Sequence, residues 1–310
     1  MSRPTKKLGS WLRRHSLTLV AALGGAAGVA YAAGWHKPAA TVTATRAADV
    51  QPVGAAAAVP EKDTVVDTVQ IALLLDTSSS MNGLINQARA HLWNMVDQMG
   101  KMTRVVDGKV RGVKIELALY EYGNDRLPRE DGYIRQVLPL TGDLDKVSEQ
   151  LNGLFTNGGS EFAGQAIQVS ATKLQWSSDP SALKFIFVAG NEEFDQGPVS
   201  AAEAMAAAAK ANISVQLILC DNNEATWESA AKLAKSDLAK IDQNQVAVHI
   251  PSPQDTEILQ LGDQLNNTYM AYGSEGQASI ARQKDADVSS AKMSPKVAIE
   301  RAQLKSKKAY

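Results

Sequence analysis

Residues 69–80, VQIALLLDTSSS, join a continuous apolar run to a carboxylate and hydroxyls. An apolar run as long as Val69–Leu75, bounded by polar residues, is typical of a strand buried on both faces of a parallel sheet. Directly after it come Asp76 and, at alternating positions, Ser78 and Ser80. Open α/β sheets bind ligands at the carboxyl ends of their strands, so we expect these oxygens to point into such a crevice.

The chain beyond this stretch alternates strand and helix patterns. The predicted strands are Val69–Asp76, Val113–Tyr122, Tyr133–Leu140, Leu183–Ala189, Ser214–Cys220 and Val246–Ile250. The predicted helices are Met81–Met99, Asp143–Leu154, Glu161–Leu174, Val199–Ala211, Ala225–Ser236 and Thr256–Met270. This rhythm predicts an α/β fold: three layers, doubly wound, with a mostly parallel sheet. Gly123–Gly132 is too short for a helical crossover, so the strand after it is predicted to be antiparallel, at an edge.

The two ends of the chain have a different composition. Leu17–Trp35 has no charged residue and follows Arg13-Arg14-His15, the pattern of a cleaved signal peptide or a retained membrane anchor. A buried Ala-rich helix is the alternative. The predicted organisation is a leader or hydrophobic anchor helix over 1–35, an Ala/Pro-rich linker over 36–64, the α/β domain over 65–273, and a polar, basic tail over 274–310. The tail is expected to form one or two exposed helices, or to be disordered.

Charge and cysteine content exclude some functions. Residues 1–46 hold seven Lys/Arg and no Asp or Glu, whereas the whole chain has 32 basic and 33 acidic residues. The body is therefore mildly acidic, unlike a nucleic-acid-binding domain with its concentrated basic face. A single cysteine, Cys220, excludes an internal disulfide and is expected to be buried. Basic residues ahead of the apolar segment predict export of the body, either anchored in the inner membrane and facing the periplasm, or periplasmic or secreted after cleavage.

Several catalytic patterns are absent from the sequence. Its four histidines show no zinc-ligand spacing, and the chain contains no phosphate-binding Gly-x-x-x-x-Gly-Lys loop. It also lacks a Gly-x-Ser-x-Gly elbow, and Ser78 has no evident histidine partner to act as a base. These absences argue against an enzyme.

Asp76-Thr77-Ser78-Ser79-Ser80 resembles the first loop of a von Willebrand factor A domain, and the order of elements from about residue 68 to 273 is similar to that fold. The resemblance implies a metal-ion-dependent adhesion site built by three loops. The family's first loop supplies an aspartate and two serines, which match Asp76, Ser78 and Ser80. Its second loop supplies a threonine, often after Gly-Gly; here Ser160, in Gly158-Gly159-Ser160-Glu161, would supply that hydroxyl.

The third loop departs from the family pattern. An aspartate usually follows the fourth strand, but Gly190-Asn191-Glu192-Glu193 stands there instead. Asn191 or Glu192 could supply an oxygen in its place, and Glu161 is a further candidate. Together with Asn266-Asn267-Thr268-Tyr269, these motifs resemble a bacterial branch of exported A-domain proteins with a variant site.

Each candidate also has an ordinary structural explanation. The serines of the first loop could cap the following helix, since serine is a favoured N-cap. Ser160 and Glu161 could begin a helix, where the helix dipole favours Glu161. Asn191 and Glu192 could form an ordinary strand-to-loop turn. Asn124 and Asp125 end the second predicted strand on the same side and are candidates to support the ligands, with a solvated turn as the alternative.

The predicted metal set is therefore made of oxygen donors only, which suit Mg²⁺, Ca²⁺ or Mn²⁺. Its members are Asp76, Ser78, Ser80, Ser160, Glu161, Asn191 and Glu192. The predicted function is cation-dependent protein binding at the cell envelope, with the metal bridging to an acidic group of a partner and without catalysis. The alternatives are a scaffold whose site binds no metal, because the third-loop aspartate is missing, and a metal-dependent hydrolase with Glu161 or Glu192 as base.

Overall fold

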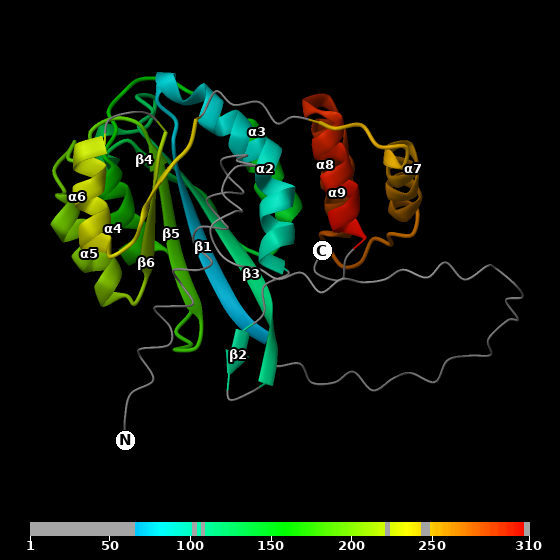
Figure 1. Ribbon diagram of the computed structural model, residues 1–310, viewed down its shortest axis with the longest axis horizontal. Coiled ribbons are helices and arrows are strands. Elements are labelled where there is room, and N and C mark those ends of the chain that lie inside the picture. Colours follow the sequence, from blue (N-terminus) through cyan, green and yellow to red (C-terminus); the bar gives the residue numbers. More distant parts are fainter. Residues whose placement is uncertain (1–65, 101–103, 107–108, 221–223, 243–248, 307–310) are drawn as a thin grey trace, which may run out of the picture.

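The computed structural model describes residues 66–306, except 101–103, 107–108, 221–223 and 243–248. In this part of the chain a sheet lies between two layers of helices (Figure 1). The strands are β1 (Val66–Asp76), β2 (Arg104–Val106), β3 (Lys109–Tyr122), β4 (Ile134–Thr141), β5 (Leu183–Gly190), β6 (Ser214–Leu219) and β7 (Leu238–Lys240). The helices are α2 (Asn82–Gly100), α3 (Leu144–Gly153), α4 (Ala163–Lys173), α5 (Ala201–Lys210), α6 (Glu224–Ala234), α7 (Asp255–Asn266), α8 (Gly276–Met293) and α9 (Pro295–Lys305), with short 3-10 turns η1 (Ser79–Met81) and η2 (Arg129–Asp131).

The sheet has the predicted mixed character. Its strand order is β2-β3-β1-β5-β6-β7, and β4 also pairs with β3. The pairs of β1 with β3, β1 with β5, β5 with β6 and β6 with β7 are parallel, and β4 is antiparallel to β3. A second antiparallel strand, the three-residue β2, was not anticipated. The three-layer α/β prediction is confirmed.

The central strand β1 supplies side chains to both layers of the core. Ile71, Leu73 and Leu75 belong to the apolar cluster under α2, α3 and α9, whereas Ala72 and Leu74 belong to the cluster under α4, α5 and α6. Successive side chains of a strand point to opposite faces, so a strand covered on both faces must be apolar at every position. This requirement explains why Ile71–Leu75 is apolar at every position.

The last predicted strand is wrong where it can be checked. Of Val246–Ile250, residues 246–248 lie outside the described residues, while His249 and Ile250 are not in a strand and Ile250 is 84% exposed. The strand beside β6 is instead β7, which pairs through Leu217 and Leu238. The three residues of β7 form a pattern too short to distinguish a strand from a loop. The alternating apolar residues that end at Ile250 have the periodicity of a strand, which led to the wrong prediction.

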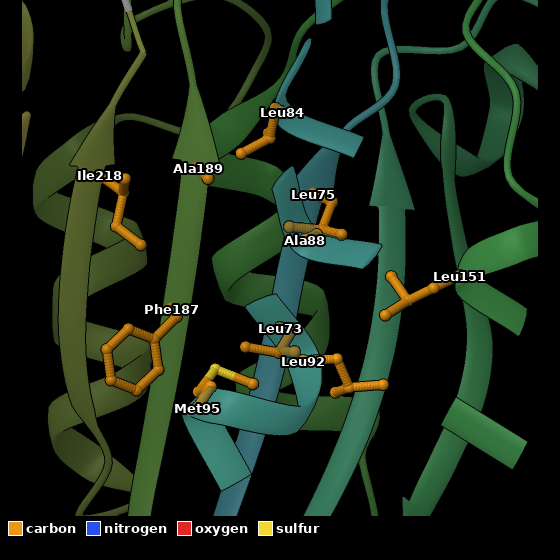
Figure 2. A pocket seen from close by; sticks show the side chains of 10 residues that line it. All are labelled: Leu73, Leu75, Leu84, Ala88, Leu92, Met95, Leu151, Phe187, Ala189 and Ile218. Atoms are coloured by element: carbon orange, nitrogen blue, oxygen red, sulfur yellow. The ribbon is translucent and has the colours of Figure 1, made fainter. Parts of the chain in front are cut away.

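A small apolar cavity lies in the core beside α2. Its volume is about 10 Å³, at the lower limit for one water molecule. In Figure 2 the lining side chains come from α2, α3 and three strands, and converge between helix and sheet. They are all apolar, so a water there would have no hydrogen-bond partner; we regard the cavity as a packing void and not a ligand site. The lining residues are Leu73, Leu75, Leu84, Ala88, Leu92, Met95, Leu151, Phe187, Ala189 and Ile218.

The C-terminal tail forms two helices, α8 and α9, that meet at Ser294-Pro295, near the predicted break. The expectation that these helices are exposed is wrong, because α9 packs against α2 and places Val297 and Leu304 in the core. Arg301 is only 1% exposed. The buried face of α9 was not recognised from the sequence because some of its buried residues are charged.

An ion-pair cluster holds these helices to the domain. Arg301 Nη1 lies 2.6 Å from Asp145 Oδ1 on α3, and Arg301 Nε lies 2.9 Å from Asp287 Oδ1 on α8. Lys305 Nζ pairs with Asp287 Oδ2 at 2.6 Å. The Arg301 guanidinium also lies 4.2 Å from the centre of the Trp93 ring on α2. The cluster therefore joins α2, α3, α8 and α9.

The predicted leader and linker, 1–35 and 36–64, lie outside the described residues. Within the described part of the chain, no helix combines the length and hydropathy needed to span a bilayer. The domain boundary at 273 stays a prediction.

Candidate functional site

Three chain segments meet at the carboxyl-terminal edge of the sheet. The first follows β1, the second runs between α3 and α4, and the third follows β5. Because β1 and β5 are parallel neighbours, their carboxyl ends lie side by side. Backbone hydrogen bonds fasten the first two segments: Asn157 N donates to Thr77 O at 2.9 Å, and Ser79 N donates to Gly158 O at 3.0 Å. The loops are thus positioned by their backbones and not only by side chains.

Four of the predicted ligands form one hydrogen-bonded chain. The backbone N–H of Ser78 donates to Asp76 Oδ1 at 2.7 Å, and the hydroxyls of Ser78 and Ser80 lie 3.1 Å apart. Asn191 Nδ2 donates to Ser80 Oγ at 3.1 Å. The first and third loops, more than a hundred residues apart in sequence, are therefore in direct contact. Asn191 occupies the position where the family pattern led us to expect an aspartate.

Glu161 adds a second buried carboxyl group. Asp76 is 0% exposed and Glu161 is 5% exposed. Burial raises the pKa of Asp76 well above its usual range, and the charge of Glu161 raises it further. Burial also raises the pKa of Glu161, and the nearby charge of Glu192 adds to this, although hydrogen bonds with Asp76 and Ser78 oppose it.

One oxygen of each carboxyl group has no hydrogen-bond partner. Asp76 Oδ2 and Glu161 Oε2 are buried and unsatisfied. Buried polar atoms are nearly always paired, and unpaired buried carboxylates are strongly unfavourable. Two unpaired oxygens in neighbouring carboxyl groups fit a divalent cation between them, or a proton that the pair shares.

Two glycines leave room for the Asp76 carboxylate, and the sequence reasoning missed both. Gly123 has φ +81°, and a Cβ there would lie 2.8 Å from Asp76 Oδ1 and 3.0 Å from Glu161 Cγ. A Cβ on Gly190 would collide with the hydroxyl of Tyr122 and lie 3.4 Å from Asp76 Oδ2. The available signal was that each glycine directly follows a predicted strand.

Tyr122 was also missed. Its hydroxyl donates to Ala189 O at 2.9 Å and so links β3 to β5 beneath the site. Burial raises the pKa of this phenol, and the charges of Asp76 and Glu161 raise it further. Tyr122 therefore stays a neutral donor that fixes the two strands carrying Gly123 and Gly190.

The remaining predicted ligands lie close by but outside the hydrogen-bonded chain. Ser160 is half-buried, and its backbone forms a bridge with Gly123. Glu192 is exposed, and its carbonyl accepts a hydrogen bond from Trp227 Nε1 at 2.6 Å. Ser160 is therefore placed beside the Asp76–Glu161 pair by its backbone, and Glu192 lies at the rim.

The structure gives little support for Ser78, Ser160 or Glu161 as helix caps. Ser78 occupies the N-cap position of η1, but its side chain makes no capping hydrogen bond. Helix α4 begins at Ala163, after Ser160 and Glu161, and its N-cap residue is Phe162. The hydroxyl of Ser78 and the carboxyl of Glu161 are therefore directed to the site and not to a helix end.

The donor set suits a hard cation. Among the described residues, no three His, Cys, Asp or Glu side chains converge as a metal-binding group, so any metal would depend on hydroxyl and amide oxygens beside the two carboxylates. Such neutral and anionic oxygens suit Mg²⁺, Ca²⁺ or Mn²⁺. The residues present fit such an ion, and the metal role of the seven predicted residues stays a prediction.

Three solved structures illustrate what the chain is similar to. An aerotolerance-related membrane protein from Bacteroides fragilis is 17% identical, with a TM-score of 0.41, covering 57% of this chain and 93% of its own. Proximal thread matrix protein 1 from the mussel byssus, described with a zinc-occupied MIDAS motif, is 12% identical, with a TM-score of 0.41, covering 58% of this chain and 43% of its own. The SpRpn10 VWA domain is 18% identical, with a TM-score of 0.38, covering 66% and 96%.

No curated protein matches the chain in sequence. The family model described as von Willebrand factor type A domain matches residues 70–259, a range that contains most of β1, all of β2 to β7 and every residue of the candidate site. This match covers more than half of the chain. The protein therefore belongs to the von Willebrand factor type A domain family.

Proposed function

We propose that this protein binds another protein through a divalent cation held at the edge of its sheet. Domains of this family generally mediate interactions between proteins, and they are typically not enzymes. The observation that carries the proposal is the buried pair Asp76–Glu161, in which each carboxyl group keeps one oxygen without a hydrogen-bond partner. A partner carboxylate would complete the site.

The donors have complementary roles. Asp76 and Glu161 would supply the negative charge, and Ser78, Ser80, Ser160 and Asn191 would supply neutral oxygens, with Glu192 at the rim as a further candidate. When bound, a cation such as Mg²⁺ supplies positive charge and water-filled positions that a carboxylate can take. The neutral amide of Asn191 leaves more of that positive charge uncompensated than an aspartate would. A less compensated site attracts an anionic partner more strongly.

The direct test is a calorimetric titration of the full chain with Mg²⁺, Ca²⁺ and Mn²⁺. We expect binding by the parent protein and none by Asp76→Asn. Asp125→Asn is the matched control, because Asp125 is an exposed carboxylate at the same edge of the sheet. Absence of heat with all three ions, or equal binding by the two variants, would refute the metal proposal.

A second candidate function is a metal-free interaction scaffold. The raised pKa values of Asp76 and Glu161, both buried and close enough for the charge of Glu161 to raise the pKa of Asp76, favour a pair that shares one proton. Such a pair needs no cation to be stable. In this case Asp76→Asn would leave partner binding and its resistance to chelator unchanged.

The proposed location is the cell envelope, on the basis of the basic and apolar pattern of residues 1–35. Fractionation and mass spectrometry of the amino terminus test this. A full-length chain in the membrane fraction indicates an anchor, and a shortened one in the periplasm indicates a cleaved leader. Full-length protein confined to the cytoplasm would contradict both.

A further inference from the structure

A solvent-facing aromatic side chain lies on the second loop of the candidate site. Phe155 is 49% exposed, and it directly follows Leu154, which is buried. The guanidinium of Arg126, an exposed residue after β3, lies 4.8 Å from the centre of the Phe155 ring. Single exposed apolar residues are common on protein surfaces. This one is unusual because a cation covers its ring and because it stands beside a site.

Backbone contacts attach Phe155 and Arg126 firmly to the site loops. Asn124, which is buried, donates from Nδ2 to Phe155 O at 3.0 Å and accepts from Arg126 N at 3.1 Å. Asp125 N donates to Asn157 O at 3.3 Å, and Asn157 in turn bonds to the first loop. Two residues of chain span at most about 7 Å, so the Phe155 backbone lies within that distance of Asn157. The pair is therefore ordered before any partner binds.

Arg126 retains its charge-pairing capacity. Within the described residues, no carboxylate forms an ion pair with its guanidinium, whose central carbon lies over the Phe155 ring. The neighbouring carboxylate of Asp125 lies against Gly158 instead. Arg126 can thus donate a bidentate pair of hydrogen bonds to a partner's carboxylate.

The opposite side of the site carries the opposite charge. Glu192 and Glu193 are exposed after β5. An acidic partner would be repelled there and attracted toward Arg126. The loop of Arg126 is of mixed charge, because Arg129 and the exposed Asp125, Glu130 and Asp131 lie in the same segment. The attractive contact for a carboxylate is therefore the guanidinium of Arg126 and not the loop as a whole.

We infer that Phe155 and Arg126 form the second contact of the binding surface, and that the occupant is an acidic protein segment. It places one carboxylate at the metal, a second carboxylate on Arg126 and a large apolar side chain on Phe155. Aromatic and arginine side chains dominate binding energy at protein interfaces, and preordered ones lose little entropy on binding. The metal-bound carboxylate in this inference rests on the proposed function; the roles of Phe155 and Arg126 do not.

The test uses a phage-displayed random peptide library panned on the full chain in Mg²⁺. The consensus peptide is then synthesised, and its affinity is measured by fluorescence anisotropy. We expect a consensus with two acidic residues and a large apolar one. Phe155→Ala and Arg126→Gln should each weaken binding about 30-fold, as expected for a hot-spot residue. Tyr272→Ala and Lys210→Gln are matched controls at other exposed positions and should bind like the parent.

A chelator arm separates this inference from the proposed function. If EDTA abolishes binding while Phe155→Ala and Arg126→Gln bind like the parent chain, the inference is overturned and the metal proposal stands. If the two variants weaken binding but EDTA has no effect, the metal proposal fails and the second contact stands. A parent chain that enriches no acidic, apolar consensus would also overturn the inference. Thermal melting of both variants excludes loss of folding as the cause.

Discussion

Gly123→Ala offers the sharpest test of how the site is built. The substitution has two separable effects. An alanine at φ +81° occupies the left-handed region, which is unfavourable by roughly 1–2 kcal/mol for an L-residue. Its Cβ would also lie 2.8 Å from Asp76 Oδ1, so the carboxylate must move away from the Ser78 N–H that holds it at 2.7 Å.

The second effect can be estimated from that hydrogen bond. A hydrogen bond to a charged group contributes about 1.5–3 kcal/mol, and a shift of a few tenths of an ångström weakens it in part. Together the two effects predict a loss of about 3 kcal/mol in the free energy of unfolding. For a domain of this size that is a fall in Tm of roughly 6–12 °C. Cation affinity should fall at least about tenfold, because the displaced oxygen is a predicted ligand.

Two other glycines supply matched controls. Gly273 has φ +69°, and a Cβ added there would meet nothing within 4 Å, so Gly273→Ala measures backbone strain alone. Gly159, beside Ser160, has neither strain nor a neighbour, so Gly159→Ala should be close to neutral. The assays are urea denaturation and calorimetric titration with Mg²⁺. If Gly123→Ala matches Gly273→Ala in stability and keeps parental cation affinity, the close approach to Asp76 has no functional meaning and the reasoning fails.

Three further predictions concern the cluster under α9, the support of the first loop and the effect of pH. Arg301→Met removes a buried cation and its ion pairs with Asp145 and Asp287, so it should destabilise the fold by about 3 kcal/mol in urea denaturation. The exposed Lys292→Met should stay within about 0.5 kcal/mol of the parent. Glu121→Gln weakens the acceptor for the Thr77 hydroxyl, which lies 3.2 Å from Glu121 Oε2. It should lower Mg²⁺ affinity about tenfold in calorimetry, whereas Glu116→Gln on the same strand should leave that affinity unchanged. A carboxyl group whose pKa is raised by folding holds its proton longer in the folded state, so the metal-free protein should lose stability as pH rises above the ordinary carboxyl range. Excess Mg²⁺ should therefore raise Tm more at pH 8 than at pH 5, and an equal rise at both would contradict the shared role of the pair.

The sequence predicted the parts of the site that are local in the chain. Asp76, Ser78 and Ser80 follow one buried strand within five residues, and the apolar run before them made that strand evident. Asn191 was a candidate because it follows another such strand. Adjacent parallel strands bring their carboxyl ends together, so both sets met as expected.

Features that depend on which strands are neighbours were not predictable. The space that Gly123 and Gly190 leave for Asp76 exists only because β3 and β5 flank β1, which a single sequence does not specify. Arg301 lies in the tail that was predicted to be exposed, because the helical pattern treats its charged residues as polar. Its burial depends on carboxylates from α3 and α8. Likewise β7 is defined by its pairing with β6 and not by its own three residues.

The position of β1 in the sheet has a consequence for synthesis of the chain. This strand emerges from the ribosome before both of its neighbours, since β3 begins at Lys109 and β5 begins at Leu183. Until Gly190 has been synthesised, β1 has an unpaired edge because β5 is incomplete. Apolar strands with an unpaired edge are prone to self-association. Because pairing over long sequence separations is slow, a nascent chain that pauses before residue 190 should be the species that most needs a chaperone.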